Sequence, residues 1–267
     1  MVRGATETVS GELREKAMDY RYARQVVLRE FGPRGQEKLL ASSVLCVGAG
    51  GLGSPLLIYL AAAGVGRIGI ADADRVDLGN LQRQIIYTTS DIGKPKAVCA
   101  ARRLAQLNGD LVYEPIDRNL VADNARDLIS RYDLVADCTD NFEARFLMND
   151  TCFELRKPLV SAAVLGFEGY LAFFPMSGSG PCLRCMAPEA PPAELRADPA
   201  SRGIMGVMAG AVGVLEAFEA IKCLAGFGEN LAGKLLVFDG LGTSFRKVEL
   251  PRDPDCPLCG SSQENTR

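Results

Sequence analysis

The stretch from Val44 to Gln84 constrains the fold of this chain more than any other part of the sequence. A short apolar run enters a turn with four glycines, an alanine- and leucine-rich segment follows, and a second apolar run ends at Asp72. This order predicts a strand, a tight turn, a helix and a second strand with a carboxylate at its tip. Glycines let a phosphate or ribose approach the helix N-terminus, where free N–H groups favour anions. The stretch therefore predicts a nucleotide site, but it leaves the kind of nucleotide open.

Charge and composition limit the partners of the chain. The 267 residues carry a formal net charge of −3, so no overall basic field points to nucleic acid or to an anionic membrane. The most apolar segment, Met205 to Phe227, contains two glutamates and a lysine on successive turns, which favours a buried helix over a membrane span. The start of the chain is polar and lacks the apolar core of a signal peptide. We therefore expect a cytoplasmic protein with neither nucleic acid nor membrane as a partner.

The cysteines predict a metal centre. The chain has no histidine and nine cysteines, an odd number that argues against a disulfide framework. Four of them form two CxxC pairs, Cys182 with Cys185 and Cys256 with Cys259. Each pair can hold a metal through two thiolates, and two pairs brought together by the fold complete a tetrahedral zinc site. A redox pair or incidental turn cysteines are the alternative. Because a Cys₄ shell has no open position, we expect a structural role.

Apolar periodicity predicts alternating strands and helices as far as Pro158, followed by antiparallel strands. The fold class is therefore α/β, with a Rossmann-like, doubly wound, mainly parallel sheet that antiparallel strands continue. The loop 186–203 is rich in proline and alanine and is either functional or mobile. Helices are expected over 16–31, 35–41, 91–108, 122–130, 142–156 and 205–227. Later strands are expected over 111–116, 133–137, 159–164, 169–174, 234–239 and 244–250.

A dehydrogenase is the first hypothesis for the nucleotide site. The glycines of residues 48–53 followed by Asp72 fit a dinucleotide fingerprint in which the carboxylate holds a ribose. Basic and amide residues cluster beyond the second strand, at Asn80, Arg83 and Lys96. Such donors suit a triphosphate better than a diphosphate already held by the glycine turn.

Many motifs in order carry a family resemblance. They are Arg21-Tyr-x-Arg24-Gln25, GAGGLGSP at 48–55, Asp72-x-Asp74, Asn80-Leu-Gln-Arg83-Gln84, Gly93-Lys-Pro-Lys96, Asp137-Cys-Thr-Asp140-Asn141, both CxxC pairs and Gly213-Val-Leu-Glu216-Ala-x-Glu219-Ala-Ile-Lys222. In this set the chain resembles the ThiF/MoeB/HesA family, the bacterial relatives of ubiquitin-activating enzymes. The resemblance covers roughly residues 18–260. It implies a single adenylation domain over 1–267, with a nucleotide-binding part at about 18–157, a carrier-binding and zinc part at about 158–260, and disordered ends at 1–15 and 261–267.

The resemblance implies an ATP-dependent adenylyltransferase. Such enzymes transfer AMP to the C-terminal glycine carboxylate of a small ubiquitin-like sulfur-carrier protein ending in Gly-Gly, and release pyrophosphate. The products serve thiamine, molybdopterin or related biosynthesis. This chemistry needs cations and alignment rather than a base, which fits a chain without histidine. Adenylation of a peptide or another carboxylate, a non-catalytic scaffold and a nicotinamide-dependent dehydrogenase remain alternatives.

The resemblance also implies nucleotide-binding residues. Gly51 would lie against the nucleotide through its backbone, and Asp72 would accept hydrogen bonds from the ribose. Gly79 and Asn80 belong to the same nucleotide-binding set, with Asn80 on the phosphates.

The implied catalytic residues are Arg83, Lys96, Asp140 and Arg24. Arg83 and Lys96 would contact the phosphates and stabilise the leaving pyrophosphate. Asp140 would hold Mg²⁺, with Asn141 beside it. Arg24 would come from the partner subunit, which implies a homodimer. Each residue also has an ordinary alternative: a surface charge for Arg83, a helix start for Lys96, a helix cap for Asp140 and an exposed helical charge for Arg24.

The chain departs from the family pattern in one place. Many relatives have a cysteine before the long helix, whereas this chain has none from 186 to 222 and has Arg202 at the aligned position. We therefore expect no covalent intermediate from this loop, and an acyl-adenylate that passes to an external sulfur donor. No segment after the second CxxC pair is long enough for a sulfurtransferase domain. Loop 186–203 would cover the carrier's tail, or it is merely disordered.

Overall fold

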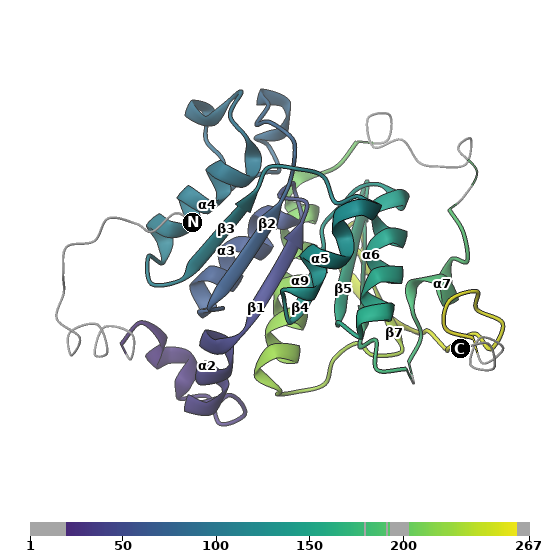
Figure 1. Ribbon diagram of the computed structural model, residues 1–267. Helices are drawn as coiled ribbons and strands as arrows, with labels where there is room; N and C mark the ends of the chain where they lie inside the picture. Colours follow the sequence, from purple (N-terminus) through teal and green to yellow (C-terminus); the bar gives the residue numbers. More distant parts are fainter. Residues whose placement is uncertain (1–19, 179, 191, 193–202, 261–267) are drawn as a thin grey trace.

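The computed structural model describes residues 20–178, 180–190, 192 and 203–260, with one central sheet (Figure 1). The sheet has eight strands in the order β3-β2-β1-β4-β5-β6-β7-β8. The first five strands in this order are parallel, and β6, β7 and β8 continue the sheet antiparallel. The predicted fold class is therefore confirmed. The strands are β1 (Ser43–Val47), β2 (Arg67–Ala71), β3 (Val112–Ile116), β4 (Leu134–Asp137), β5 (Leu159–Leu165), β6 (Glu168–Phe174), β7 (Lys234–Asp239) and β8 (Ser244–Glu249).

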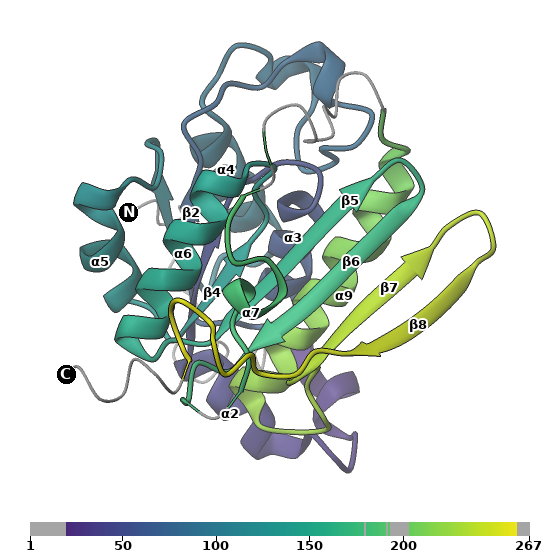
Figure 2. The same ribbon diagram turned by 90° about the vertical axis from the view of Figure 1, so that its right-hand side faces the viewer.

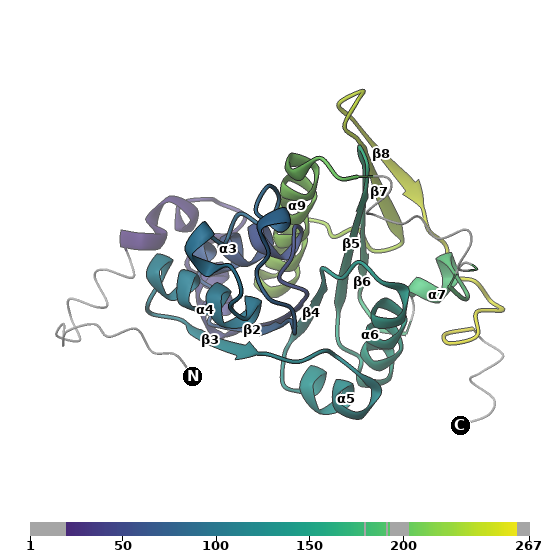
Figure 3. The same cartoon turned by 90° about the horizontal axis from the view of Figure 1, so that it is seen from above.

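Helices cover both faces of the parallel part (Figures 1 and 3). Helices α3, α4 and α9 pack on one face, and α5 and α6 pack on the other. All five residues of β1 are buried, because a central parallel strand is covered on both sides. Its side chains alternate between the two cores: Val44 and Cys46 face α3, while Leu45 and Val47 face the α5–α6 side. The helices are α2 (Gly32–Ala41), α3 (Gly53–Ala63), α4 (Lys96–Leu107), α5 (Ala122–Ser130), α6 (Phe142–Leu155), α7 (Leu183–Met186) and α9 (Gly206–Ala225).

Three predicted helix boundaries are wrong. The helix expected over 16–31 ends at residue 26, and a turn follows it. The helix expected over 91–108 begins only at Lys96, because Pro95 follows a separate 3₁₀ turn, η2 (Thr89–Asp91), that the Asp91 side chain closes. The helix expected over 35–41 already begins at Gly32. Pro33 lies in its first turn, where the missing N–H costs no hydrogen bond.

The structure tests some of the remaining expectations, while others concern residues that it does not describe. α9 confirms the long helix near 205–227, and among the described residues no helix is long and apolar enough to cross a membrane. The two ends expected to be disordered, and most of the predicted loop 186–203, lie outside the described residues.

The sheet order places a switch point between β1 and β4. From β1 the chain crosses to β2 on one side, while the strand on the other side, β4, comes later in the chain. In such sheets ligands bind in the crevice at the carboxyl ends of the strands beside the switch point. The glycine turn after β1 and the loop after β4 both lie there.

Candidate active site

A cavity of about 930 Å³ opens at this switch point. Its volume is at the upper end of the range of small-molecule sites. The glycine turn, the tip of β2, the start of α4, the loop after β4 and the end of β5 line it. Of the residues that the sequence predicts for the nucleotide, six line the cavity: Gly51, Asp72, Arg83, Lys96, Asp140 and Asn141.

Two glycines let the turn after β1 pack closely. Gly48 has a φ of 91°, and a Cβ there would lie 2.7 Å from the carbonyl oxygen of Cys138. A Cβ at Gly53 would lie 2.1 Å from the carbonyl oxygen of Gly48. No other residue fits these positions without moving the backbone. The turn therefore holds the first residues of α3 against the cavity, where an anion is favoured.

Asp72 ties this turn to β2. Its two oxygens accept hydrogen bonds from the backbone N–H groups of Ala49 at 2.7 Å and Asp74 at 2.8 Å. Burial raises the pKa of the Asp72 carboxyl, and the two backbone hydrogen bonds oppose that shift. Each carboxylate oxygen keeps a lone pair that can accept a ribose hydroxyl.

Two cations, Lys96 and Arg83, also border the cavity. The Lys96 side chain is only 5% exposed, and its ammonium lies 2.9 Å from the carboxylate of Asp74, which is 73% exposed. A lysine in the first turn of a helix is unfavourable unless an anion compensates it. Arg83 is half-buried, and its Nη1 donates to the carbonyl oxygen of Gly79 at 3.1 Å. The two side chains thus bring positive charge to the cavity.

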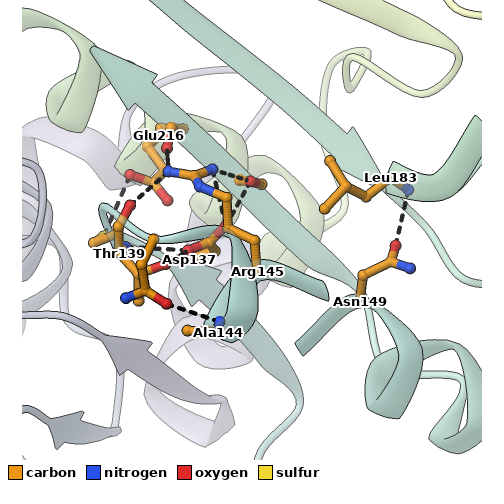
Figure 4. A network of polar contacts seen from close by, with 11 residues as sticks. Asp137, Thr139, Ala144, Arg145, Asn149, Leu183 and Glu216 are labelled. Atoms are coloured by element: carbon orange, nitrogen blue, oxygen red, sulfur yellow. Dashed lines mark hydrogen bonds and ion pairs between the residues drawn. The ribbon is translucent and has the colours of Figure 1, made fainter. Parts of the chain in front are cut away.

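The loop after β4 presents a carboxylate. Asp140 is exposed at the cavity, and its side chain has no polar partner in the described part of the chain. Asn141, not Asp140, caps α6, because its Oδ1 accepts a hydrogen bond from Ala144 N at 2.9 Å (Figure 4). The alternative of Asp140 as a helix cap is therefore wrong.

Three predicted residues do not line the cavity: Arg24, Gly79 and Asn80. Gly79 and Asn80 form the 3₁₀ turn η1 (Leu78–Asn80), and the Asn80 carbonyl accepts the backbone N–H of Arg83 at 3.0 Å. Arg24 is exposed on a helix at residues 20–26. The neighbouring Gln25 bonds the carbonyl of Ala63, at the end of α3 away from the cavity. Arg24 therefore does not reach the cavity of its own chain, and its role in a partner subunit stays a prediction.

Sequence reasoning assigned no role to Arg145, which also lines the cavity. Its guanidinium bonds the loop after β4 and the strand β5 (Figure 4). The signal was its position one turn into α6, on the same helix face as Asn141. Two of its partners, Ser161 and Ala162, come from β5, a strand that only the fold brings near.

The two CxxC pairs meet as predicted. The four sulfur atoms lie within 4.8 Å of one another, with 3.7 Å between Cys182 and Cys256 and 3.3 Å between Cys185 and Cys259. A zinc ion about 2.3 Å from four tetrahedral sulfurs requires sulfurs about 3.8 Å apart. The donor set and its size therefore fit zinc. Figure 2 shows the C-terminal loop, in yellow, beside α7.

The cysteine cluster is fastened to α6. Asn149 Oδ1 accepts the backbone N–H of Leu183 at 2.8 Å, and both groups are buried (Figure 4). Asp150 pairs with Arg184 through two hydrogen bonds, at 2.8 and 2.7 Å. One helix therefore contacts both the cavity and the cluster.

A doubly wound sheet, a nucleotide-sized cavity at its switch point and a four-cysteine cluster suited to zinc are the features of a nucleotide-binding α/β protein. The chain belongs to the ThiF family, whose model matches residues 22–258. It is 48% identical over 244 residues to the sulfur carrier protein adenylyltransferase of Thermus thermophilus, covering 90% of each chain. It is also 47% identical over 241 residues to the pig adenylyltransferase and sulfurtransferase MOCS3, covering 90% of this chain and 53% of that one. The chain thus spans about half the length of this MOCS3 relative.

Solved structures share the fold. Escherichia coli MccB with ATP superposes with a TM-score of 0.78 at 20% identity, covering 95% of this chain and 83% of that one. The complex of MccB with MccA-N7isoAsn gives a TM-score of 0.79 at 21% identity, over 91% and 75% of the two chains. At these identities the likeness concerns the fold alone. The family membership, with the cations at the cavity, sets aside the dehydrogenase alternative.

Proposed function

We propose that this chain is an ATP-dependent adenylyltransferase. It activates the C-terminal glycine carboxylate of a small ubiquitin-like sulfur-carrier protein as an acyl-adenylate and releases pyrophosphate. One observation carries this proposal: a single cavity combines the glycine turn and Asp72 with Arg83, Lys96 and Asp140. The names of the Thermus and MOCS3 relatives support the same reaction and the same class of substrate.

The residues divide the work between binding and charge. The glycine turn and Asp72 hold the nucleoside, with the Asp72 carboxylate accepting the ribose hydroxyls. Arg83 and Lys96 neutralise the phosphates, so that the carrier carboxylate can attack the α-phosphorus while pyrophosphate leaves. The attacking carboxylate carries no proton, so the step needs no general base. The rate enhancement comes from alignment of the reacting groups and neutralisation of the phosphate charge.

Asp140 fits a magnesium ligand. Its carboxylate is exposed at the cavity and has no polar partner in the described part of the chain. Magnesium in phosphate sites takes one or two carboxylates together with phosphate oxygens. Bound there with ATP, Mg²⁺ would supply further neutralisation of phosphate charge.

Partners complete the proposal. Arg24 would enter the cavity of a second copy in a homodimer, since it lies away from its own. An external sulfur donor would take the acyl-adenylate. In the proposed division of the domain, residues of about 18–157 bind the nucleotide and about 158–260 bind the carrier and zinc. The reaction would take place in the cytoplasm, where free thiols stay reduced.

The test is ATP–pyrophosphate exchange with a ubiquitin-like carrier ending in Gly-Gly. We expect exchange with the intact carrier and none with a carrier that lacks its last glycine. Arg83→Ala and Asp140→Ala should each slow exchange by about 10²-fold or more, the scale of losing one charge-stabilising group. Arg126→Ala is the control, because Arg126 is exposed on α5 and pairs with Glu154 outside the cavity. Undiminished exchange in both site variants would mean that the assigned site is wrong.

A further inference from the structure

One side chain of α6 fastens the loop after β4 to the strand β5 (Figure 4). Arg145 Nη1 donates to the carboxylate of Asp137 at 3.1 Å and to the Ser161 hydroxyl at 3.0 Å. Its Nη2 donates to the backbone carbonyls of Thr139 at 2.5 Å and Ala162 at 2.7 Å. Asp137 and Thr139 precede Asp140, whereas Ser161 and Ala162 belong to β5. One guanidinium therefore bridges two walls of the cavity.

The surroundings make this bridge rigid. Asp137 is fully buried, and the Arg145 side chain is 13% exposed. The second oxygen of Asp137 accepts from the Thr139 hydroxyl at 2.6 Å, and the first also accepts from the Ser161 hydroxyl at 2.7 Å. A buried charge pair with its hydrogen bonds satisfied is costly to break, because each partner would be left charged and unpaired.

The same contacts favour a role in holding protein groups over a direct role on the substrate. Both Nη atoms of Arg145 already donate to protein oxygens. Arg83 differs, because within the described part of the chain its guanidinium makes one hydrogen bond, to Gly79. Arg145 lines the cavity, yet both its Nη groups donate to protein oxygens. It is therefore suited to hold other groups in place.

The two bridged walls serve different halves of the reaction. The loop after β4 carries Asp140 to the cavity, where the proposed function uses it beside the phosphates. Three residues that follow Ala162 along β5 line the cavity on the side away from Asp72: Ala163, Val164 and Leu165. With the nucleotide at the glycine turn, the β5 side is left for the acyl substrate. The spacing of these walls sets the approach of carboxylate to phosphorus.

We propose that Arg145 is a positioning residue, which fixes the distance between the phosphate-binding loop and the β5 wall that holds the carrier's C-terminal tail. This inference rests on the proposed function. A displacement of about 1 Å between reacting groups costs about 10²-fold in rate. Binding of ATP depends on the loop after β4, and binding of the carrier's tail depends on β5. Each substrate alone therefore depends on only one of the two bridged walls. Loss of the bridge therefore lowers kcat and leaves both KM values almost unchanged.

The experiment measures kcat and KM in carrier-dependent exchange for three variants. Arg145→Lys keeps the charge but cannot make four hydrogen bonds, so we expect kcat to fall about 10²-fold with both KM values within about two-fold. Ser161→Ala removes one bond of the bridge and should lower kcat several-fold, again without a change in KM. Arg126→Lys, at the exposed pair with Glu154, is the matched control and should behave as the wild type.

A readout apart from activity follows the bridge itself. In Arg145→Lys the backbone amides of 139–141 and of 161–163 should exchange with solvent faster than in the wild type, whereas those of the control should not. An unchanged kcat in both Arg145→Lys and Ser161→Ala, with an active wild type, overturns this inference alone. A tenfold higher KM at unchanged kcat also overturns it, because Arg145 would then bind substrate. A wild-type chain without carrier-dependent exchange overturns the proposed function and this inference with it. If Arg145→Lys does not fold, Ser161→Ala decides.

Discussion

The helix α6 joins two regions that are built in opposite ways. Toward its C-terminal half, Asn149 and Asp150 are both paired with residues beside the cysteine cluster, and four thiols gather within 4.8 Å. At its N-terminal end, Asp140 presents a carboxylate that has no polar partner in the described chain. Nearby, the buried Lys96 has a mostly exposed partner. The cluster region satisfies its own polar groups, whereas at the cavity Asp140 and Lys96 keep charge available for a ligand.

This difference teaches where stability and where activity should respond to substitution. A region whose polar groups pair with one another contributes to folding, and removing one member leaves its partner buried and unsatisfied. A region that keeps charged groups free for a ligand gains its partners only on binding. Substitutions near the cluster should therefore change the free energy of unfolding, and substitutions at the cavity should change the rate of exchange.

The largest effect expected on stability is the loss of the metal. Cys185→Ser removes one of four thiolates, so we expect zinc content to fall from about one equivalent per chain and Tm to fall by more than about 5 °C. Metal analysis of protein purified with reductant and without chelator, with thermal unfolding, measures both. Cys223→Ser is the control, since Cys223 is equally half-buried but lies on α9 outside the cluster. Less than half an equivalent of zinc in the wild type would contradict a structural zinc site.

A smaller effect on stability is expected from substitutions that compare the two parts of α6 directly. Asn149→Ala leaves the buried N–H of Leu183 without its acceptor, so we expect a loss of about 1–3 kcal/mol in the free energy of unfolding. The rate of ATP–pyrophosphate exchange should stay unchanged. Asn141→Ala removes the helix cap at the cavity and should cost only about 1 kcal/mol, but it should slow exchange. Urea unfolding and the exchange assay of both variants give the four values. Equal effects of the two variants on exchange would remove the distinction between the regions.

The same distinction explains which parts the sequence could predict. The cysteine cluster was predictable because CxxC spacing is local and four thiolates specify a metal by themselves. The order of strands and helices followed from apolar periodicity, although the start of α4 did not. That error arose because Asp91 closes a separate turn through its side chain, a competition that periodicity does not reveal.

The cavity was predictable only in part. Asp72 and Asp140 follow strand ends, and the carboxyl ends of neighbouring parallel strands meet at one edge of a sheet. Arg145 was missed because two of its partners, Ser161 and Ala162, lie on β5, which becomes a neighbour of β4 only in the finished sheet. Whether Arg24 reaches a cavity depends on a second copy of the chain, so the sequence of one chain cannot settle its position.

The smallest expected effect concerns a buried carboxyl group near the cavity that lowers the free energy of unfolding. Glu216 on α9 is fully buried, and among the described residues its Oε1 has no hydrogen-bond partner. Burial raises the pKa of the Glu216 carboxyl well above its usual value, and the nearby Asp137 adds to this shift. The Cys138 thiol, 3.4 Å away, and Arg145 oppose it.

The raised pKa makes the stability of the fold depend on pH. The unfolded chain releases this proton above about pH 4.5, whereas the folded chain retains it, at a cost of about 1.4 kcal/mol per pH unit until the folded pKa is reached. This contribution is therefore fully present in acid and is lost as pH rises. Glu216→Gln stays neutral at every pH and should flatten the decline in unfolding free energy between pH 5 and pH 8. Because an amide needs partners for its own N–H groups, we expect a net gain of only about 1 kcal/mol at pH 8.

Urea unfolding of wild type and variant at the two pH values measures this change, and Glu219→Gln is the matched control. Glu219 is buried on the same helix, but it accepts the backbone N–H of Leu231 and pairs with Lys222. Its substitution should therefore lower stability at both pH values. If the unfolding free energy of Glu216→Gln declined with pH as steeply as that of the wild type, the burial of Glu216 would not lower the stability of the fold. The contrast between the two regions of α6 would then rest on Asp140 and Lys96 alone.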